Sequence, residues 1–368
     1  MKRNIQQDKK FLLVTFGFIL ILLFLVLCGF LDTNDPIDDE FKYSRFDPVR
    51  SETVTRKDVL IVMIVDNMAK ARKEYSTAMS TVECYAARHG YRLEILIDSD
   101  FSRKCKQTDF MFRRHCIVAD RLQHSDWVLF LDSDAAIVNA DVLIEQYIDD
   151  RFDVILYDRF DNKEVAAGSY LVKNTAWARN FLNDFADFET KLPDSFHGTD
   201  NGAIHVYLQQ VLLPNLSEQS KVCERIWKTS TGFKTLFLFE ACMRTIIGEN
   251  TDLGKVKILK KAQGWMRDVW LADGKWSPSR DFILHGLKNS LNYDNCSILR
   301  RAIYQKFVWK NPLTEELNPD ECVNLSYSWP INEELITTKE EINKVLWEKF
   351  VEIEKASWKS LKNIADYV

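Results

Sequence analysis

The sequence predicts an α/β fold in which a mostly parallel, doubly wound sheet is flanked by helices. Residues 58–66 form an apolar run bounded by two aspartates, as expected for a strand buried on both faces. Residues 74–88 then carry apolar side chains at helical spacing. A strand at 91–97, a helix at 113–124 and a strand at 127–131 follow. This β–α–β–α–β order is typical of parallel sheets with helical connections.

The rest of the chain continues the alternation. A strand at 137–138 is expected to run into a short helix at 141–148, and further elements are expected as strands at 154–157 and 169–172 and helices at 177–188 and 199–205. Thr338 and Glu341 have the spacing of a capping box, which predicts an amphipathic helix beginning there. We therefore expect a catalytic domain at 58–335 and a C-terminal segment, 336–368, whose helix packs on the domain and carries no chemistry.

The N-terminus indicates a membrane anchor. Residues 11–31 contain no charged side chain and are long enough to cross a bilayer as a helix. Basic residues lie in 1–10 and acidic residues follow the apolar segment, so the positive-inside rule places the tail in the cytosol. A cleaved signal peptide, the alternative, usually has a shorter apolar stretch that ends in small residues. We expect a single-pass type II membrane protein with a polar stem at 32–57 and a luminal domain.

Composition and cysteine use agree with that orientation. The chain has 49 basic and 54 acidic side chains and a formal net charge of −5, which argues against a nucleic-acid partner. Beyond Cys28 no cysteines are spaced as CxxC, so we expect no structural zinc site, a few disulfides of open connectivity and one leftover cysteine. Three sequons suit a secretory protein, with glycosylation acceptors at Asn215, Asn295 and Asn324.

Two carboxylates follow the third strand directly. Asp132 and Asp134 are two residues apart, and on an extended backbone such residues face the same side. In open α/β sheets, ligands bind beyond the carboxyl ends of the strands. Carboxylate oxygens suit Mg²⁺ or Mn²⁺, and such an ion can bind a diphosphate and stabilise the charge that develops as a glycosidic bond to it breaks. The pattern predicts a metal site; the alternative is a solvated turn.

Five segments, by their order and spacing along the chain, resemble those of a known family. They are His-Gly-Tyr at 89–91, Leu-Asp-Ser-Asp-Ala at 131–135, and the segments 167–174, 198–204 and 282–288. Together they resemble GT-A-fold nucleotide-sugar glycosyltransferases, closely an uncharacterised nematode family and more distantly Golgi α-galactosyl- and α-xylosyltransferases. The likeness covers nearly all of the luminal region. It implies a GT-A-like (Rossmann-like) fold, a UDP- or GDP-sugar donor, Mn²⁺ or Mg²⁺, and a glycan, glycoprotein or glycolipid acceptor. It also implies that the sugar is transferred in the Golgi lumen with retention of its anomeric configuration.

The resemblance also implies roles for single residues. Asp132 and Asp134 match the metal-binding pair, and His285 matches a late histidine that completes the metal shell, a role that suits imidazole. Asp200 and Asn201 match a catalytic acid–amide pair that faces the reacting sugar carbon. Their alternative role is to cap the helix that begins there.

Further positions are implied to bind the donor. Ser133 would meet the ribose, Asp158 the sugar hydroxyls, and Lys288 the departing diphosphate as a fixed positive charge. The full set of implied donor-binding residues is Asp66, Arg114, Ser133, Asp158, Gly168, Ser169 and Lys288. For the charged members the alternative is a solvated surface charge.

The chain differs from the distant relatives at two positions near the expected sugar site, and two other functions remain as alternatives. Ala166 replaces an asparagine of the distant relatives and Asn201 a glutamine, which leaves the donor and the stereochemistry undecided. A catalytically silent luminal binding or scaffold protein would keep the fold without turnover. A phosphoesterase would need denser clustering of histidine and aspartate than six scattered histidines provide.

Overall fold

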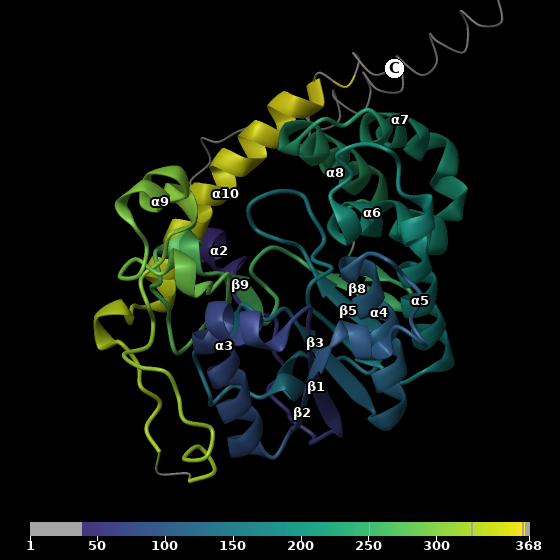
Figure 1. Ribbon diagram of the computed structural model, residues 1–368. Coiled ribbons are helices and arrows are strands. Elements are labelled where there is room, and N and C mark those ends of the chain that lie inside the picture. The colour runs from purple at the N-terminus through teal and green to yellow at the C-terminus, as the bar shows by residue number, and fades with distance from the viewer. Residues whose placement is uncertain (1–38, 250, 325–326, 363, 365–368) are drawn as a thin grey trace, which may run out of the picture. The chain divides into compact units, whose positions relative to one another are not determined.

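The computed structural model describes residues 39–249, 251–324, 327–362 and 364 (Figure 1). The expected cytosolic tail and the expected membrane-spanning segment at 11–31 lie outside these residues. None of the helices in the described part combines the length and the apolar character that a bilayer crossing requires. The chain divides into a unit at 1–42 and a compact unit at 43–368, and the latter contains the sheets.

A seven-stranded mixed sheet forms the centre of the larger unit, with the order β2-β1-β3-β6-β5-β8-β7. Five strands run in one direction, whereas β6 and β7 run in the opposite direction. The predicted α/β sheet flanked by helices is confirmed, but the sheet is mixed, because three of its strand pairs are parallel and three are antiparallel. The strands at 127–131 and 154–157 have the predicted bounds. The strands are β1 (Val59–Val65), β2 (Arg92–Ile97), β3 (Trp127–Leu131), β5 (Val154–Tyr157), β6 (Tyr170–Lys173), β7 (Asp252–Leu253) and β8 (Val256–Leu259).

Helices cover this sheet on both faces (Figure 1). Polar caps fix several of their starts: the side chains of Asn67, Asp109 and Thr175 accept from backbone N–H groups in the first turns of α3, α4 and α5. The predicted cap at Thr338 is confirmed, because its hydroxyl accepts from the N–H of Glu341 at 3.2 Å. The helices are α2 (Asp39–Ser44), α3 (Met68–His89), α4 (Phe110–Arg121), α5 (Ala176–Asp187), α6 (Thr199–Leu212), α7 (Ser217–Lys228), α8 (Phe233–Ile247), α9 (Ile298–Ile303) and α10 (Lys339–Leu361).

Strand β1 shows how the two faces are filled. All seven of its side chains are buried, and successive residues point to opposite faces. Leu60 and Val62 pack in the core formed with α4, α5, α6 and α8. Ile61 and Met63 pack in a second core with α3 and with Trp265. Burial on both faces explains why this strand reads as an uninterrupted apolar run.

A second, three-stranded sheet has the order β4-β10-β9. It contains β4 (Ala135–Ile137), β9 (Met266–Asp268) and β10 (Ile283–His285). The expected strand at 137–138 begins two residues earlier, and the expected helix at 141–148 is a 3₁₀ turn at Ile144–Tyr147. Strands β9 and β10 are too short for periodicity to reveal them.

The segment expected as a stem is in part integrated into the domain. From Tyr43 onward the chain belongs to the compact unit, so the boundary expected at residue 58 lies too late. Phe46 is buried against Phe160 and, on α10, Phe350. The segment was expected to be a stem because most of its residues are polar or charged, and its sequence gives no sign that Phe46 is buried. Helix α10 packs on the domain through Ile342 and Leu346.

Six of the described cysteines form three disulfides. The disulfides are Cys84–Cys322, Cys105–Cys116 and Cys223–Cys242, and the described Cys296 is buried and unpaired. The expectation of a few disulfides with one cysteine left over is confirmed for the described residues. The sequon residues Asn215, Asn295 and Asn324 are all exposed.

Candidate metal centre

Three side chains from two sheets meet beyond the carboxyl end of β3. Asp132 directly follows that strand, and Asp134 directly precedes β4. The Ala135 N–H donates to the Asp132 carbonyl at 3.1 Å, which closes the turn between them. One ligand atom from each of Asp132, Asp134 and His285 lies within 4.8 Å of the other two. The residues that sequence reasoning assigned to a metal are therefore neighbours in space.

His285 reaches the carboxylates through the pairing of β10 with β4, which sets it opposite Ala135. The N–H groups of Gly286 and Leu287 both donate to the Asp134 carbonyl, at 3.0 and 2.9 Å. Gly286 has φ +90°, and a β-carbon there would lie 2.2 Å from the Trp270 ring. The glycine after the histidine is thus required by the backbone turn and by the indole.

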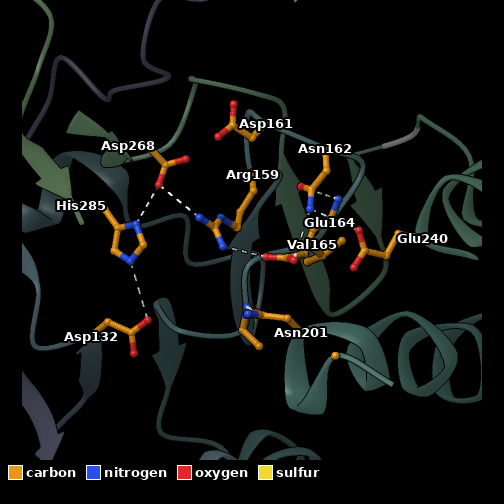
Figure 2. Close-up of polar contacts among 12 residues, drawn as sticks. Asp132, Arg159, Asp161, Asn162, Glu164, Val165, Asn201, Glu240, Asp268 and His285 are labelled. Atoms are coloured by element: carbon orange, nitrogen blue, oxygen red, sulfur yellow. Dashed lines mark hydrogen bonds and ion pairs between the residues drawn. The ribbon is translucent and has the colours of Figure 1, made fainter. Parts of the chain in front are cut away.

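The imidazole lies between carboxylates (Figure 2). Its Nε2 is 3.3 Å from Asp134 Oδ1 and 3.9 Å from Asp132 Oδ2. Burial lowers the pKa of His285, but the charges and hydrogen bonds of Asp134 and Asp268 outweigh it and raise the pKa to about 10. Without a metal, the imidazolium is the cation beside Asp134, whereas Arg114 is the cation beside Asp132.

Asp134 is held as an anion. Burial raises its pKa, yet His285 and then Lys288 outweigh burial and hold the pKa of this carboxyl well below its usual range. Lys288 Nζ lies 3.8 Å from Asp134 Oδ2 and its side chain is 44% exposed, so its charge is free to face a ligand.

Asp132 is fixed from its other side by α4. Arg114 Nη1 donates to Asp132 Oδ1 at 2.5 Å, while its Nη2 donates to Asp200 Oδ2 at 2.6 Å. His115 Nε2 lies 3.1 Å from the same Asp200 oxygen. The guanidinium therefore joins a candidate metal ligand to a buried carboxylate, and it leaves Asp132 Oδ2 facing the histidine.

The residues present fit a divalent cation. Two carboxylates and an imidazole are ligands that Mn²⁺ accepts well, and Mg²⁺ accepts the oxygens. Gly168 makes room for the first carboxylate, because a β-carbon at that residue would lie 2.0 Å from Asp132 Oδ2. Ser133 lies between the two aspartates and is partly exposed.

The structure revises two of the implied direct contacts with a sugar. Asp200 is completely buried; Oδ2 pairs with Arg114 and His115, and Oδ1 accepts from the N–H of Asn201. Ser169 is also completely buried; its hydroxyl donates to the Phe130 carbonyl at 2.8 Å and accepts from Trp265 at 3.0 Å. Neither side chain is placed to meet a ligand, so their placement favours positioning and packing roles.

The other expected residues surround the centre at different depths. Asn201 is partly exposed, and its Oδ1 accepts from the Ala167 N–H at 3.0 Å, which ties α6 to the segment before β6 that contains Gly168. Asp158 pairs with Arg244 at 3.0 Å and lines a pocket that it shares with His285. Asp66 is exposed at the end of β1 and pairs with Lys70 at 2.7 Å, which agrees with the alternative of a solvated charge.

Two residues near the centre escaped sequence reasoning. Tyr75 sits at a kink inside α3, with φ −126° and ψ 17°. Burial, and then the charge of Asp134, raise the pKa of its hydroxyl to about 12, so the phenol stays protonated beside the carboxylates. Asp268, at the end of β9, accepts from His285 Nδ1 at 2.7 Å. Tyr75 lies on the apolar stripe of a helix and Asp268 in a strand of three residues, so neither has a local signature.

With the geometry in place, comparisons identify the family. A family profile described as "Protein of unknown function, DUF273" matches residues 82–299, more than half of the chain. The chain belongs to the DUF273 family. The segment that matches DUF273 contains all three candidate metal ligands together with Asp200. The family description assigns no function, so the expected likeness to a nematode family and to Golgi transferases stays a prediction.

Other comparisons add little. No curated protein matches this DUF273 chain. A solved structure of a glycosyltransferase involved in the glycosylation of the major capsid of PBCV-1 is similar with a TM-score of 0.33 and 19% identity, over 43% of this chain and 76% of that chain. We draw no conclusion from a similarity at this level.

Proposed function

We propose that this DUF273 protein is a metal-dependent glycosyltransferase. It moves a hexose or pentose from a UDP- or GDP-sugar to a glycan, glycoprotein or glycolipid acceptor, with retention. The observation that carries the proposal is the meeting of Asp132, Asp134 and His285 beyond the carboxyl end of β3. In open α/β sheets this edge is where ligands bind.

The three residues would hold Mn²⁺ or Mg²⁺. Such an ion, when bound, supplies positive charge to a diphosphate and stabilises that group as it leaves the sugar. Lys288 adds a fixed cation on the exposed side of Asp134. Together these groups serve a reaction in which a nucleoside diphosphate departs.

The neighbouring residues keep the ligands in place. Arg114 and Asp200 form a buried ion pair that holds Asp132, so Asp200 supports the reaction from behind the metal site. Asn201 fixes Ala167 and so the approach of Gly168 to Asp132. Partly exposed Asn201 and Asp158 are the polar groups that we assign to the sugar.

We also propose a luminal location. The apolar segment at 11–31 supports a type II anchor. The disulfides and the exposed sequons suit the oxidising secretory pathway. Within that pathway we propose the Golgi, where nucleotide sugars are available.

Turnover of nucleotide sugars tests the function. The full chain, purified in detergent, is incubated with a panel of UDP- and GDP-sugars in Mn²⁺, Mg²⁺ or EDTA, and released nucleotide and transferred sugar are separated by chromatography. We expect one donor to be consumed only with metal, and Asp134→Asn to lose most of that turnover. Asp273→Asn, on an exposed turn, is the matched control.

Two outcomes would redirect the interpretation. Metal-dependent nucleotide binding without turnover of any donor would favour the silent binding protein. Equal turnover by Asp134→Asn and wild type would overturn the metal assignment.

A further inference from the structure

The candidate metal ligand His285 uses its second ring nitrogen within the protein. Nε2 faces Asp132, whereas Nδ1 lies 2.7 Å from Asp268 Oδ1 (Figure 2). Asp134 Oδ1 lies 3.3 Å from the same Nε2. The parallel pairing of β10 with β9 sets His285 directly opposite Asp268. Both residues end short strands, so backbone hydrogen bonding fixes the distance between them.

Asp268 is in turn held by a chain of polar contacts that is buried except at Arg159, whose side chain is 25% exposed. Arg159 Nη2 lies 3.3 Å from Asp268 Oδ1, and its Nη1 lies 3.2 Å from Glu164 Oε1 (Figure 2). Asn162 Nδ2 then joins Glu164 Oε2 at 3.3 Å to Glu240 Oε2 of α8 at 3.2 Å. The chain of contacts therefore runs from the second sheet, through the loop after β5, to a helix on the main sheet.

Because Asp268 is buried, the loss of one of its charged partners would destabilise the protein. Asp268 is 4% exposed, so its carboxylate has little water to replace a lost partner. Among the described residues, the cationic side chains that contact this carboxylate are Arg159 and His285. Because removing one partner of a buried ion pair leaves an uncompensated charge, the carboxylate and the ring keep one another in place.

An imidazole binds a cation through one nitrogen, and the hydrogen bond at the other nitrogen decides which one is available. Donation from Nδ1–H to a carboxylate leaves the Nε2 lone pair for a metal and fixes the orientation of the ring. Here Nε2 is the nitrogen that faces Asp132 and Asp134. The geometry is that of a carboxylate–histidine–metal arrangement.

We propose that Asp268 is a positioning residue of the metal centre, which holds His285 so that Nε2 faces Asp132 and Asp134, and that Arg159 holds Asp268 in turn. This inference rests on the proposed function, since it requires that the three ligands bind a metal. Asp268 itself does not touch the ion or the substrate. Its role is to keep a ligand in its binding orientation.

Mn²⁺ affinity, measured without substrate, tests the inference. Free Mn²⁺ is followed by its electron paramagnetic resonance signal as the full chain is titrated, for wild type, Asp268→Ala, Asp268→Asn and His285→Ala. We expect Asp268→Ala to bind Mn²⁺ about 10- to 100-fold more weakly. Asp268→Asn keeps an oxygen that accepts from Nδ1–H, so its affinity should lie between those of Asp268→Ala and wild type.

A second measurement separates positioning from folding. Thermal unfolding is recorded in EDTA for each variant, and the exposed Asp273→Asn serves as a control that should change neither quantity, because asparagine tolerates the left-handed backbone of residue 273. Partial rescue of Mn²⁺ affinity by asparagine, in variants that unfold at the wild-type temperature, is a pattern that loss of folding alone does not produce. If Asp268→Ala does not fold, Asp268→Asn decides the question, and wild-type affinity in that variant overturns the inference.

The arms also separate this inference from the proposed function. Wild-type protein that binds no Mn²⁺ would overturn both. If wild type binds Mn²⁺ and both Asp268 variants bind it as tightly as wild type, the positioning role alone is overturned and the metal centre stands.

Discussion

The backbone of Gly168 lies directly against the carboxylate of Asp132, so closely that a β-carbon at residue 168 would sit 2.0 Å from Oδ2. The contact follows from the antiparallel pairing of β6 with β3, which sets Phe130 opposite Tyr170 and carries Gly168 to the end of β3. Asp132 cannot retreat freely, because Arg114 holds its other oxygen. A residue without a side chain is therefore needed beside the candidate metal ligand Asp132.

The first prediction concerns that contact. Gly168→Ala should displace the Asp132 carboxylate and weaken Mn²⁺ binding at least about tenfold, the cost typical of disturbing the surroundings of a ligand. Gly232→Ala is the matched control, because a β-carbon at residue 232 meets no atom within 4 Å. Calorimetric titration of Mn²⁺ checks both variants. Unchanged affinity in Gly168→Ala would show that Asp132 is not constrained as described.

The second prediction concerns the buried guanidinium. Arg114→Met leaves Asp200 buried without its main partner, so the free energy of unfolding should fall by about 3–5 kcal/mol. Arg72→Met removes a surface ion pair with Glu83 and should cost less than about 1 kcal/mol. Guanidinium denaturation in EDTA measures both. Similar losses in the two variants would contradict a structural role for the Arg114–Asp200 pair.

Much of the sheet could be predicted because its central strands are buried on both faces. The apolar run that becomes β1 and the run that ends at Leu131 stand out from charged surroundings. Asp132 and Asp134 were visible for the same reason, as carboxylates directly after such a run. His285 has no such local signal, since a strand of three residues shows no period; it was found through a resemblance only.

Contacts between distant segments explain what sequence reasoning missed. Asp268 contacts His285, and the pairing of β9 with β10 brings the two together. Asp200 was expected to face the sugar, yet its side chain is completely buried and forms an ion pair with Arg114. Phe46 lies in a charged segment that was expected to be a stem, and its burial depends on α10, about three hundred residues later.

The third prediction concerns acid stability. Burial, and then the charge of Arg244, lower the pKa of His205 from 6.5 to about 4. Between these values the unfolded chain binds a proton that the folded chain excludes, so stability is lost as the pH falls through this window. By linkage the loss approaches about 3 kcal/mol.

A substitution isolates this contribution. His205→Gln should abolish this share of the acid destabilisation, seen as a smaller difference in unfolding free energy between pH 7 and pH 4, whereas His124→Gln at the surface should not. Parallel pH profiles for His205→Gln and wild type would contradict the assignment.

The fourth prediction compares two disulfides. Cys84–Cys322 joins residues 238 apart, whereas Cys105–Cys116 joins residues 11 apart. In the chain-entropy model the long loop constrains the unfolded state more, so replacing both cysteines by alanine should cost about 5 kcal/mol for the first pair and about 3 kcal/mol for the second. Denaturation curves of the two double variants test the order. The reverse order would contradict it.

The fifth prediction addresses the centre itself and is the most direct test. Binding of UDP and GDP to the full chain is measured calorimetrically in Mn²⁺ and in EDTA, for wild type and for Asp134→Asn, with Asp273→Asn as the surface control. We predict that one nucleotide binds wild type and the control only with Mn²⁺, and that Asp134→Asn lowers this affinity at least about tenfold, because it removes a charged ligand. Equal binding with and without metal, or undiminished binding by Asp134→Asn, would contradict a metal centre at Asp132, Asp134 and His285.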